Sequence, residues 1–245
     1  MTGDYVLGHE GAGQIEWIGE NVRHLQKGDR VAVEPGMPCG LCSLCSEGQY
    51  NLCRTVCFSG APPYNGSIRR FHVHKARYLH KLPESLSFAD GALLEPLSVI
   101  MHAFERSPVH LGEPTLICGA GPIGLIALAV AKASGAYPVV ITDVDEKRLQ
   151  FAKFFEPKCE TFLVPIDAQP EETAAQLCSV FTEKLESPQP RVVYECTGVQ
   201  SSVLIASLTA ARGGEVMVVG VGRPILNGFP FMHLSMSEVC KMYCP

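Results

Sequence analysis

A glycine-rich turn at residues 118–124, Cys-Gly-Ala-Gly-Pro-Ile-Gly, constrains the fold of this chain more than any other feature. It contains the pattern G-x-G-x-x-G, follows an apolar stretch at residues 115–118 and opens a helical pattern. In that context Gly119 allows the tight turn, Gly121 lets the backbone approach a pyrophosphate, and Gly124 lets the helix pack closely on the strand. The turn therefore predicts a dinucleotide-binding site.

An acidic residue stands where such a site needs one. Asp143 ends the next apolar stretch, and its carboxylate can accept hydrogen bonds from the ribose hydroxyls of NAD. The alternative is that Asp143 caps the following helix, a role that Asp145 can also fill.

From residue 98 onward, helical and strand patterns alternate. Five short strands, nearly all apolar, are crossed by helices, which predicts a parallel, doubly wound sheet. The expected strands are residues 115–118, 138–142, 161–165, 191–195 and 215–219, and the expected helices are residues 98–106, 123–134, 146–155, 171–186 and 201–211.

The first part of the chain has a different pattern. It is rich in glycine and proline, and its short β-type runs lie at residues 14–18, 30–33 and 70–74. This pattern predicts a mostly β domain with long loops. We expect two domains, residues 1–97 and 98–245.

Four cysteines fall at the spacing C-x2-C-x2-C-x7-C within residues 39–53. Thiolates are good zinc ligands, and short gaps let one loop surround a tetrahedral ion, so the pattern predicts a structural zinc lobe. An iron–sulfur cluster fits less well, because its bacterial motif ends with a three-residue gap. Four unliganded thiols are the other alternative. The ligands are Cys39, Cys42, Cys45 and Cys53.

A second group of metal-binding side chains is spread along the chain. His9 and Glu10 follow a glycine, and Glu95 stands among leucines, where a carboxylate needs a cation or a metal nearby. One histidine and two carboxylates fit part of a catalytic zinc shell. The alternatives are a structural histidine at position 9 and an ion pair of Glu95 with Arg69 or Arg70.

Composition narrows the possible partners and compartment. The chain has 245 residues, a net charge of −5, and 20 basic against 25 acidic residues without a basic block, which argues against nucleic-acid binding. No apolar run reaches membrane-spanning length, so we expect no membrane partner. The N-terminal residues have no signal-peptide pattern, and a cysteine cluster without one favours the reducing cytoplasm.

Together these motifs resemble the zinc-dependent medium-chain dehydrogenases, and within them the polyol branch of sorbitol and xylitol dehydrogenases. The likeness extends over nearly the whole chain and is greatest to the fungal L-arabinitol 4-dehydrogenases. Its further support lies in Leu94-Glu95-Pro96-Leu97-Ser98 and Glu195-Cys196-Thr197-Gly198-Val199. It implies a partial GroES-like β domain followed by a Rossmann domain incomplete at its C-terminus.

The resemblance also implies roles. His9, Glu10 and Glu95 would serve the catalytic zinc in the NAD-linked oxidation of a polyol to a ketose, and the family forms homo-oligomers. The NAD contacts would come from Gly119, Gly121, Ile123, Gly124, Asp143, Arg148, Val219, Gly220 and Val221.

The chain departs from the family at both ends. Family members carry a cysteine ligand of the catalytic zinc and a proton relay before the position of His9, and they add a sheet strand after Val219. Residues 240–245 depart from their pattern. We therefore expect a fragment, an error in the assigned boundaries of the gene or a degenerate copy, with an unpaired sheet edge and impaired catalysis. The alternative function is a non-catalytic remnant that binds a dinucleotide or a partner.

Overall fold

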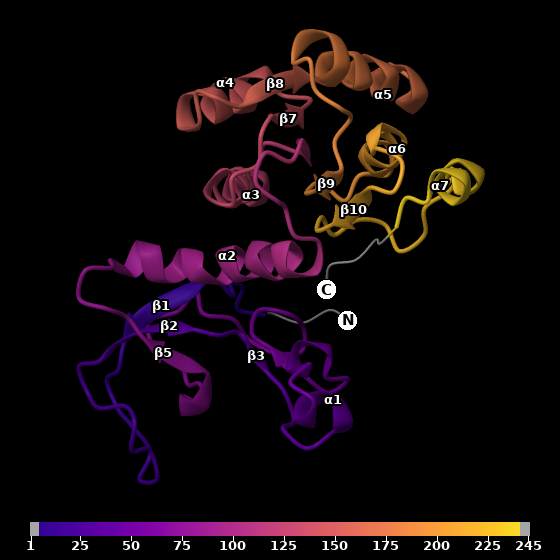
Figure 1. The fold of residues 1–245 in the computed structure, drawn as a ribbon. Coiled ribbons are helices and arrows are strands. Elements are labelled where there is room, and N and C mark those ends of the chain that lie inside the picture. The colour runs from indigo at the N-terminus through magenta and orange to yellow at the C-terminus, as the bar shows by residue number, and fades with distance from the viewer. Residues whose placement is uncertain (1–4, 241–245) are drawn as a thin grey trace. The chain divides into compact units, whose positions relative to one another are not determined.

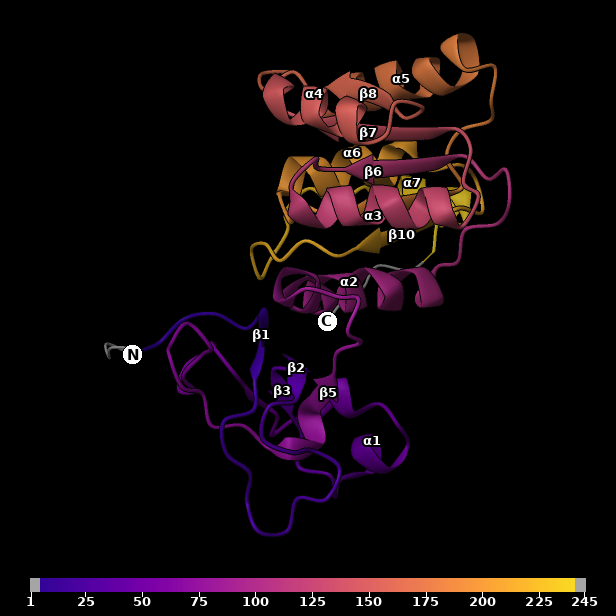
Figure 2. The same ribbon diagram turned by 90° about the vertical axis from the view of Figure 1, so that its left-hand side faces the viewer.

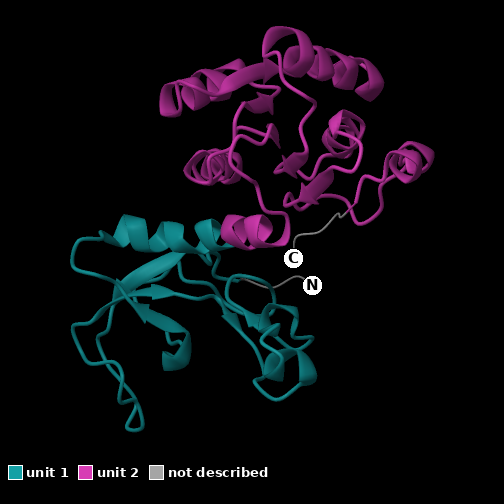
Figure 3. Ribbon diagram, in the orientation of Figure 1, with its two compact units in different colours: residues 1–98, 245 teal, residues 99–244 magenta. Residues whose placement is uncertain are grey.

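The computed structural model describes residues 5–240, which form two compact units that meet between Ser98 and Val99 in the chain (Figure 3). The first unit contains the glycine- and proline-rich part and the second contains the alternating strands and helices. The predicted departures at residues 241–245 lie outside the described residues. No helix in the described part of the chain is both long and apolar enough to cross a membrane.

The first unit is built around an antiparallel sheet of three strands. The strands β1 (Gly11–Gln14), β2 (Arg30–Val33) and β5 (Leu79–Lys81) lie in the order β1-β2-β5. Ile15, Leu25 and Val31 form its small core. A separate two-stranded sheet pairs β3 (Gly36–Met37) with β4 (Cys57–Phe58). Short helical turns complete the unit, namely α1 (Ser43–Ser46), η1 (Tyr50–Leu52) and η2 (Ala76–Tyr78).

Two strand predictions in this unit were wrong in detail. Of the strand expected at residues 14–18, only Gln14 lies in β1, and Ile15 still exchanges backbone hydrogen bonds with Asp29 and Gly28 just beyond it. The strand expected at residues 70–74 does not form. The described sheet pairs only β1, β2 and β5, and it is the His74 side chain of this segment that lies 2.8 Å from the Glu34 carbonyl oxygen.

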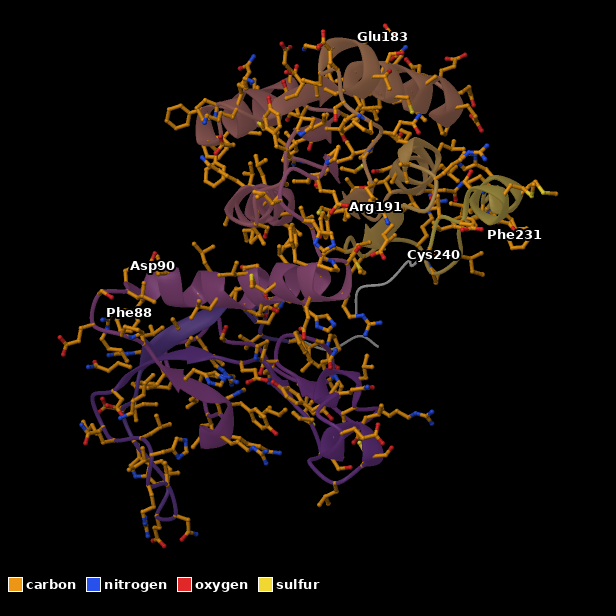
Figure 4. The ribbon with its side chains drawn as sticks, viewed as in Figure 1. Phe88, Asp90, Glu183, Arg191, Phe231 and Cys240 are labelled. Carbon is orange, nitrogen blue, oxygen red and sulfur yellow. The ribbon has the colours of Figure 1, made fainter. Side chains whose placement is uncertain are left out.

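The helix α2 (Phe88–Arg106) begins ten residues before the predicted start at residue 98. Ser87 and Asp90 cap it reciprocally, since the Ser87 amide donates to the Asp90 carboxylate at 2.7 Å and the Asp90 amide donates to Ser87 Oγ at 3.1 Å. Phe88 and Asp90 are labelled at this end of α2 in Figure 4. Pro96 lies inside this helix, and Glu95 therefore lies on a helix as well.

The second unit confirms the predicted doubly wound sheet. Five parallel strands lie in the order β10-β9-β6-β7-β8 (Figure 1), and Figure 2 shows β6 and β7 side by side. Chain order reverses between β6 and β9, the position at which such sheets bind ligands. The strands are β6 (Thr115–Cys118), β7 (Val139–Asp143), β8 (Glu160–Leu163), β9 (Val192–Glu195) and β10 (Glu215–Val218).

Helices cover both faces of this sheet, because alternate residues of each buried strand are apolar on opposite sides. Ile117 packs with the second half of α2, with α3 (Pro122–Ala133) and with α4 (Glu146–Phe155). Its neighbour Leu116 packs with the opposite layer, which α5 (Pro170–Ser179) and α6 (Gln200–Thr209) form. Figure 1 shows α3 and α6 on opposite sides of the strands.

The C-terminal part of the described chain corrects two further predictions. The helix expected at residues 171–186 changes to a wider π-helical turn, η3 (Val180–Lys184), after α5. Beyond α7 (Phe231–Ser237), Cys240 pairs in parallel with Glu215, and Val216 donates to the Cys240 carbonyl at 3.3 Å. Cys240 is labelled in Figure 4. The edge of β10 is therefore partly covered at its start, whereas we expected it to be unpaired.

Candidate metal centres and dinucleotide site

The four cysteines of the lobe come together at one point. Their sulfur atoms all lie within 4.8 Å of one another. The Cys42–Cys45, Cys39–Cys45 and Cys42–Cys53 sulfur separations are 3.4, 3.8 and 4.0 Å. Sulfurs bound to one tetrahedral zinc at about 2.3 Å lie about 3.8 Å apart, so this donor set fits zinc.

Backbone amides around the lobe favour thiolates. The amides of Leu41 and Cys42 donate to the Cys39 sulfur at 3.4 Å each, and they lower the pKa of its thiol to about 6. The Cys39 amide likewise lowers the pKa of Cys53. Desolvation instead raises the pKa of Cys45 to about 11. The lobe thus offers thiolates to a cation, and four such ligands leave no open position for a substrate.

The second predicted metal cluster is also assembled. One ligand atom from each of His9, Glu10 and Glu95 lies within 4.8 Å of the other two. Burial raises the pKa of the half-buried Glu95, while the His9 charge acts in the opposite direction. The Arg69 guanidinium donates to His72 at 3.1 Å, so the described contacts give Arg69 a partner other than Glu95. Three ligands of this kind leave an open coordination position, as a catalytic zinc site does.

A loop that sequence reasoning did not single out holds the His9 segment. The amides of Gly66, Ser67 and Ile68 donate to the carbonyls of residues 6, 8 and 7 at 2.6, 2.8 and 3.0 Å. The approach is so close that a Cβ at Gly66 would stand 2.1 Å from the Gly8 carbonyl oxygen. From β4, the Phe58 ring also approaches this segment, and its centroid lies 5.4 Å from that of the His9 ring. The motif Pro-Pro-Tyr-Asn-Gly at residues 62–66 was the available signal of a tight turn.

The glycine turn has the geometry that its sequence predicts. Gly119 has a φ of +100°, a conformation that favours glycine. A Cβ at Gly124 would stand 1.8 Å from the Gly119 carbonyl oxygen, whereas nothing lies within 4 Å of a Cβ at Gly121. The backbone at Gly121 is thus open to a ligand at the start of α3, where the helix N-terminus favours an anion. Ile123 lies in the first turn of that helix.

Asp143 ends β7 beside this turn, and its carboxylate is 6% exposed. It accepts from the Ala120 amide at 2.8 Å and from the Asp145 amide at 2.9 Å. Arg148 lies 3.7 Å away from it, with a largely exposed guanidinium. Asp145 is the N-cap of α4, because its side chain accepts from the Lys147 amide at 2.8 Å. The capping role considered for Asp143 is therefore filled by Asp145.

The third part of the predicted dinucleotide site follows β10. Val219 is buried, while Val221 is exposed. The amides of Val219 and Gly220 donate to the Glu195 carbonyl at 2.7 and 2.9 Å, which joins this loop to the end of β9. Glu195 was not among the predicted site residues, although the sequence places this carboxylate at the end of an apolar strand.

Sequence comparisons assign both units to known families. Residues 1–84 match the family described as alcohol dehydrogenase GroES-like domain, and residues 122–241 match the family described as zinc-binding dehydrogenase.

The chain is similar to several named dehydrogenases. It is 47% identical to L-arabinitol 4-dehydrogenase of Aspergillus oryzae over 99% of this chain and 64% of that protein. It is 43% identical to sorbitol dehydrogenase of Mus musculus over 96% of this chain and 63% of that protein. Galactitol-1-phosphate dehydrogenase of Escherichia coli matches its fold with a TM-score of 0.86 and 30% identity, over 98% of this chain and 67% of that chain. This chain thus spans 64% of the length of the first of these relatives.

Proposed function

The chain belongs to the zinc-binding alcohol dehydrogenases with a GroES-like domain, and we propose that it serves the NAD-linked oxidation of a polyol to a ketose. The substrate class follows from the relatives, of which one acts on L-arabinitol and another on sorbitol by name. We propose L-arabinitol, xylitol or sorbitol as substrate.

The observation that carries this proposal is the convergence of His9, Glu10 and Glu95. Glu95 follows His9 and Glu10 by at least 85 positions in the sequence, yet one ligand atom from each of the three lies within 4.8 Å of the other two. One imidazole and two carboxylates are suitable donors for zinc. Zinc held there would supply a Lewis acid that lowers the pKa of a bound alcohol.

The protein's own groups have distinct tasks in this proposal. His9 and Glu10 would hold the metal, and the amides of residues 66–68 bond the backbone of residues 6–8 directly before them. Glu95 extends from α2 and is half-buried, so it presents a carboxylate of raised pKa to the same point.

In the second unit, the open backbone at Gly121 accommodates the pyrophosphate, and Asp143 with Arg148 meets the adenosine ribose. NAD bound there would supply the hydride acceptor. The cofactor is NAD rather than NADP, because the Asp143 carboxylate would repel a 2′-phosphate. Replacing Asp143 with Ser is therefore expected to narrow the preference for NAD over NADP, as measured by calorimetric titration with both cofactors. Equal affinity of the unmodified chain for both would contradict the assignment.

The proposed function is tested by assaying the zinc-loaded chain with NAD and each candidate polyol. NADH formation is followed by absorbance with L-arabinitol, xylitol and sorbitol, and a Glu95→Gln variant serves as the inactive reference. Turnover that Glu95→Gln abolishes supports the dehydrogenase. NADH binding without turnover on any of the three polyols would instead support the non-catalytic dinucleotide-binding alternative.

A further inference from the structure

Glu195 is a fully buried carboxylate at the end of β9 that the proposed reaction does not use. The other residues of this strand are apolar or aromatic, namely Val192, Val193 and Tyr194. Burying a carboxylate is unfavourable unless its oxygens accept several hydrogen bonds. The donors that satisfy Glu195 therefore identify the part of the structure that it holds in place.

Four neutral donors point at the two oxygens of Glu195. Oε1 accepts from the Thr197 amide at 2.9 Å, from the Ser202 hydroxyl at 2.8 Å and from the Thr197 hydroxyl. Oε2 accepts from the Gly198 amide at 2.9 Å. The Thr197 hydroxyl oxygen in turn accepts from the Val199 amide at 3.0 Å. The carboxylate thus fixes the turn of residues 196–199, which connects β9 to α6.

This turn lies between two parts of the proposed dinucleotide site, because β9 is flanked by β6 and β10. On the β6 side, the Cys196 amide donates to the Cys118 carbonyl at 2.8 Å. On the same side, a Cβ at Gly119 would stand 2.7 Å from Thr197 Cγ2.

On the β10 side, the backbone of the loop after β10 lies close to the backbone of the turn. A Cβ at Gly220 would stand 2.0 Å from the Gly198 nitrogen, so the loop that begins at Val219 lies directly on the turn. The Glu195 carbonyl also accepts both amides of Val219 and Gly220. A displacement of the turn would therefore move this loop, whereas Asp143 ends β7, which is separated from β9 by β6, and Arg148 lies on α4.

We propose that Glu195 is a positioning residue of the dinucleotide site. Its buried carboxylate sets the turn of residues 196–199, and the turn sets the Val219–Val221 loop against the nicotinamide half of the cofactor. This inference rests on the proposed function, which assigns that loop to NAD. Its effect is selective, because the adenosine half of the site is anchored on β7 and α4.

The variant that tests this is Glu195→Gln, which keeps the size of the side chain but replaces one acceptor oxygen with a donor. The matched control is Glu156→Gln. Glu156 is also a buried carboxylate, but it lies at the end of α4, where it pairs with Lys132 of α3 and accepts from the Lys158 amide at 3.1 Å. The measurements are calorimetric titrations with NADH and with 5′-AMP, amide hydrogen exchange, and the thermal midpoint of the full chain.

We expect Glu195→Gln to weaken NADH binding about tenfold, the size of one lost buried hydrogen bond, and to change 5′-AMP binding less than about twofold. Exchange should accelerate at residues 196–199 and 219–221. Glu156→Gln should lower the thermal midpoint without changing NADH affinity.

Unchanged NADH affinity in Glu195→Gln overturns the positioning role and leaves the proposed function intact. An equal loss of NADH and 5′-AMP binding, accompanied by a lower thermal midpoint, also overturns it, because the role is then general to the fold. If the unmodified chain binds no NADH, the proposed function and this inference both fail.

Discussion

The two candidate metal centres of the first unit are assembled in different ways. The cysteine lobe draws its four ligands from 15 consecutive residues, 39–53, and short helical turns hold them. The other cluster joins His9 and Glu10 to Glu95, which lies on α2. The cysteine lobe depends on its own loop, whereas the His9, Glu10 and Glu95 cluster depends on every segment that places its ligands. Variants that remove one centre and keep the other therefore test this difference directly.

The largest effect is expected from Cys53→Ser, because Cys53 is the most buried of the four cysteines. Without one of its four ligands the lobe should lose its zinc. The chain then also loses the binding free energy of structural zinc, which is on the order of 10 kcal/mol in small domains. Elemental analysis of the purified full chain should show a loss of one zinc per chain. Cys57→Ser is the matched control, because Cys57 lies nearby but outside the cluster. Undiminished zinc content in Cys53→Ser would contradict a four-cysteine site.

Gly66→Ala is expected to impair the His9, Glu10 and Glu95 cluster and to spare the cysteine lobe. The added methyl group would overlap the Gly8 carbonyl oxygen and displace the His9 segment. We expect the affinity of the His9, Glu10 and Glu95 cluster for Co²⁺ to fall about a hundredfold, comparable to the loss of an important supporting contact. The thiolate absorption of Co²⁺ in the lobe should persist and report that the unit remains folded.

Gly13→Ala is the control for that experiment, since nothing lies within 4 Å of a Cβ at Gly13. Loss of both cobalt signals in Gly66→Ala, or of neither, would refute the independence of the two centres.

A smaller effect is expected from Phe58→Leu. The Phe58 ring contacts the His9 ring at a tilted angle of 59°, and such aromatic contacts contribute about 1 kcal/mol. Cobalt affinity at the His9 cluster should fall severalfold, with the lobe unchanged, in a competition titration. Phe71→Leu provides a control at an exposed phenylalanine. Equal effects of the two substitutions would show that the ring contact does not orient His9.

The smallest effect concerns pH. His72 Nε2 and His74 Nδ1 are 3.3 Å apart, and His74 Nε2 is 2.8 Å from the Glu34 carbonyl oxygen. Burial lowers the pKa of both rings, and the Arg69 charge adds to this at His72. The unfolded chain therefore binds more protons than the folded chain once the pH falls below the ordinary histidine pKa of about 6.5. Their contribution to stability is present above that pH and is lost as the pH falls.

The measurement is the thermal midpoint of the full chain between about pH 7.5 and pH 5, a range in which histidine titrates. We expect the midpoint to fall on acidification, and the decline to be shallower in a His72→Asn/His74→Asn variant. Hydrogen exchange should show the segment of residues 69–74 opening before the lobe. A variant with the same pH slope as the unmodified chain would show that these rings do not govern it.

Local patterns were sufficient for much of the second unit. Short apolar strands next to glycine turns predicted all five parallel strands within two residues, because strands buried on both faces have a distinctive sequence. The predicted roles of Gly119 and Gly124 likewise follow from local sterics. The spacing of the four cysteines also brought them within reach of one ion without any contribution from distant segments.

Only the tertiary structure decided the features that depend on distant partners. Residues 70–74 have a strand pattern but form no strand, because a strand needs backbone pairing with a neighbour and the described sheet pairs only β1, β2 and β5. Pro96 resembles a helix boundary, yet the capped start at Ser87 and packing of α2 keep it inside the helix. The proximity of Glu95 to His9, and of the Glu195 turn to Gly119 and Gly220, is likewise absent from any spacing rule. Sequence alone determined what each segment can form by itself, and the tertiary structure determined which segments meet, because long-range contacts are set by the packing of whole elements.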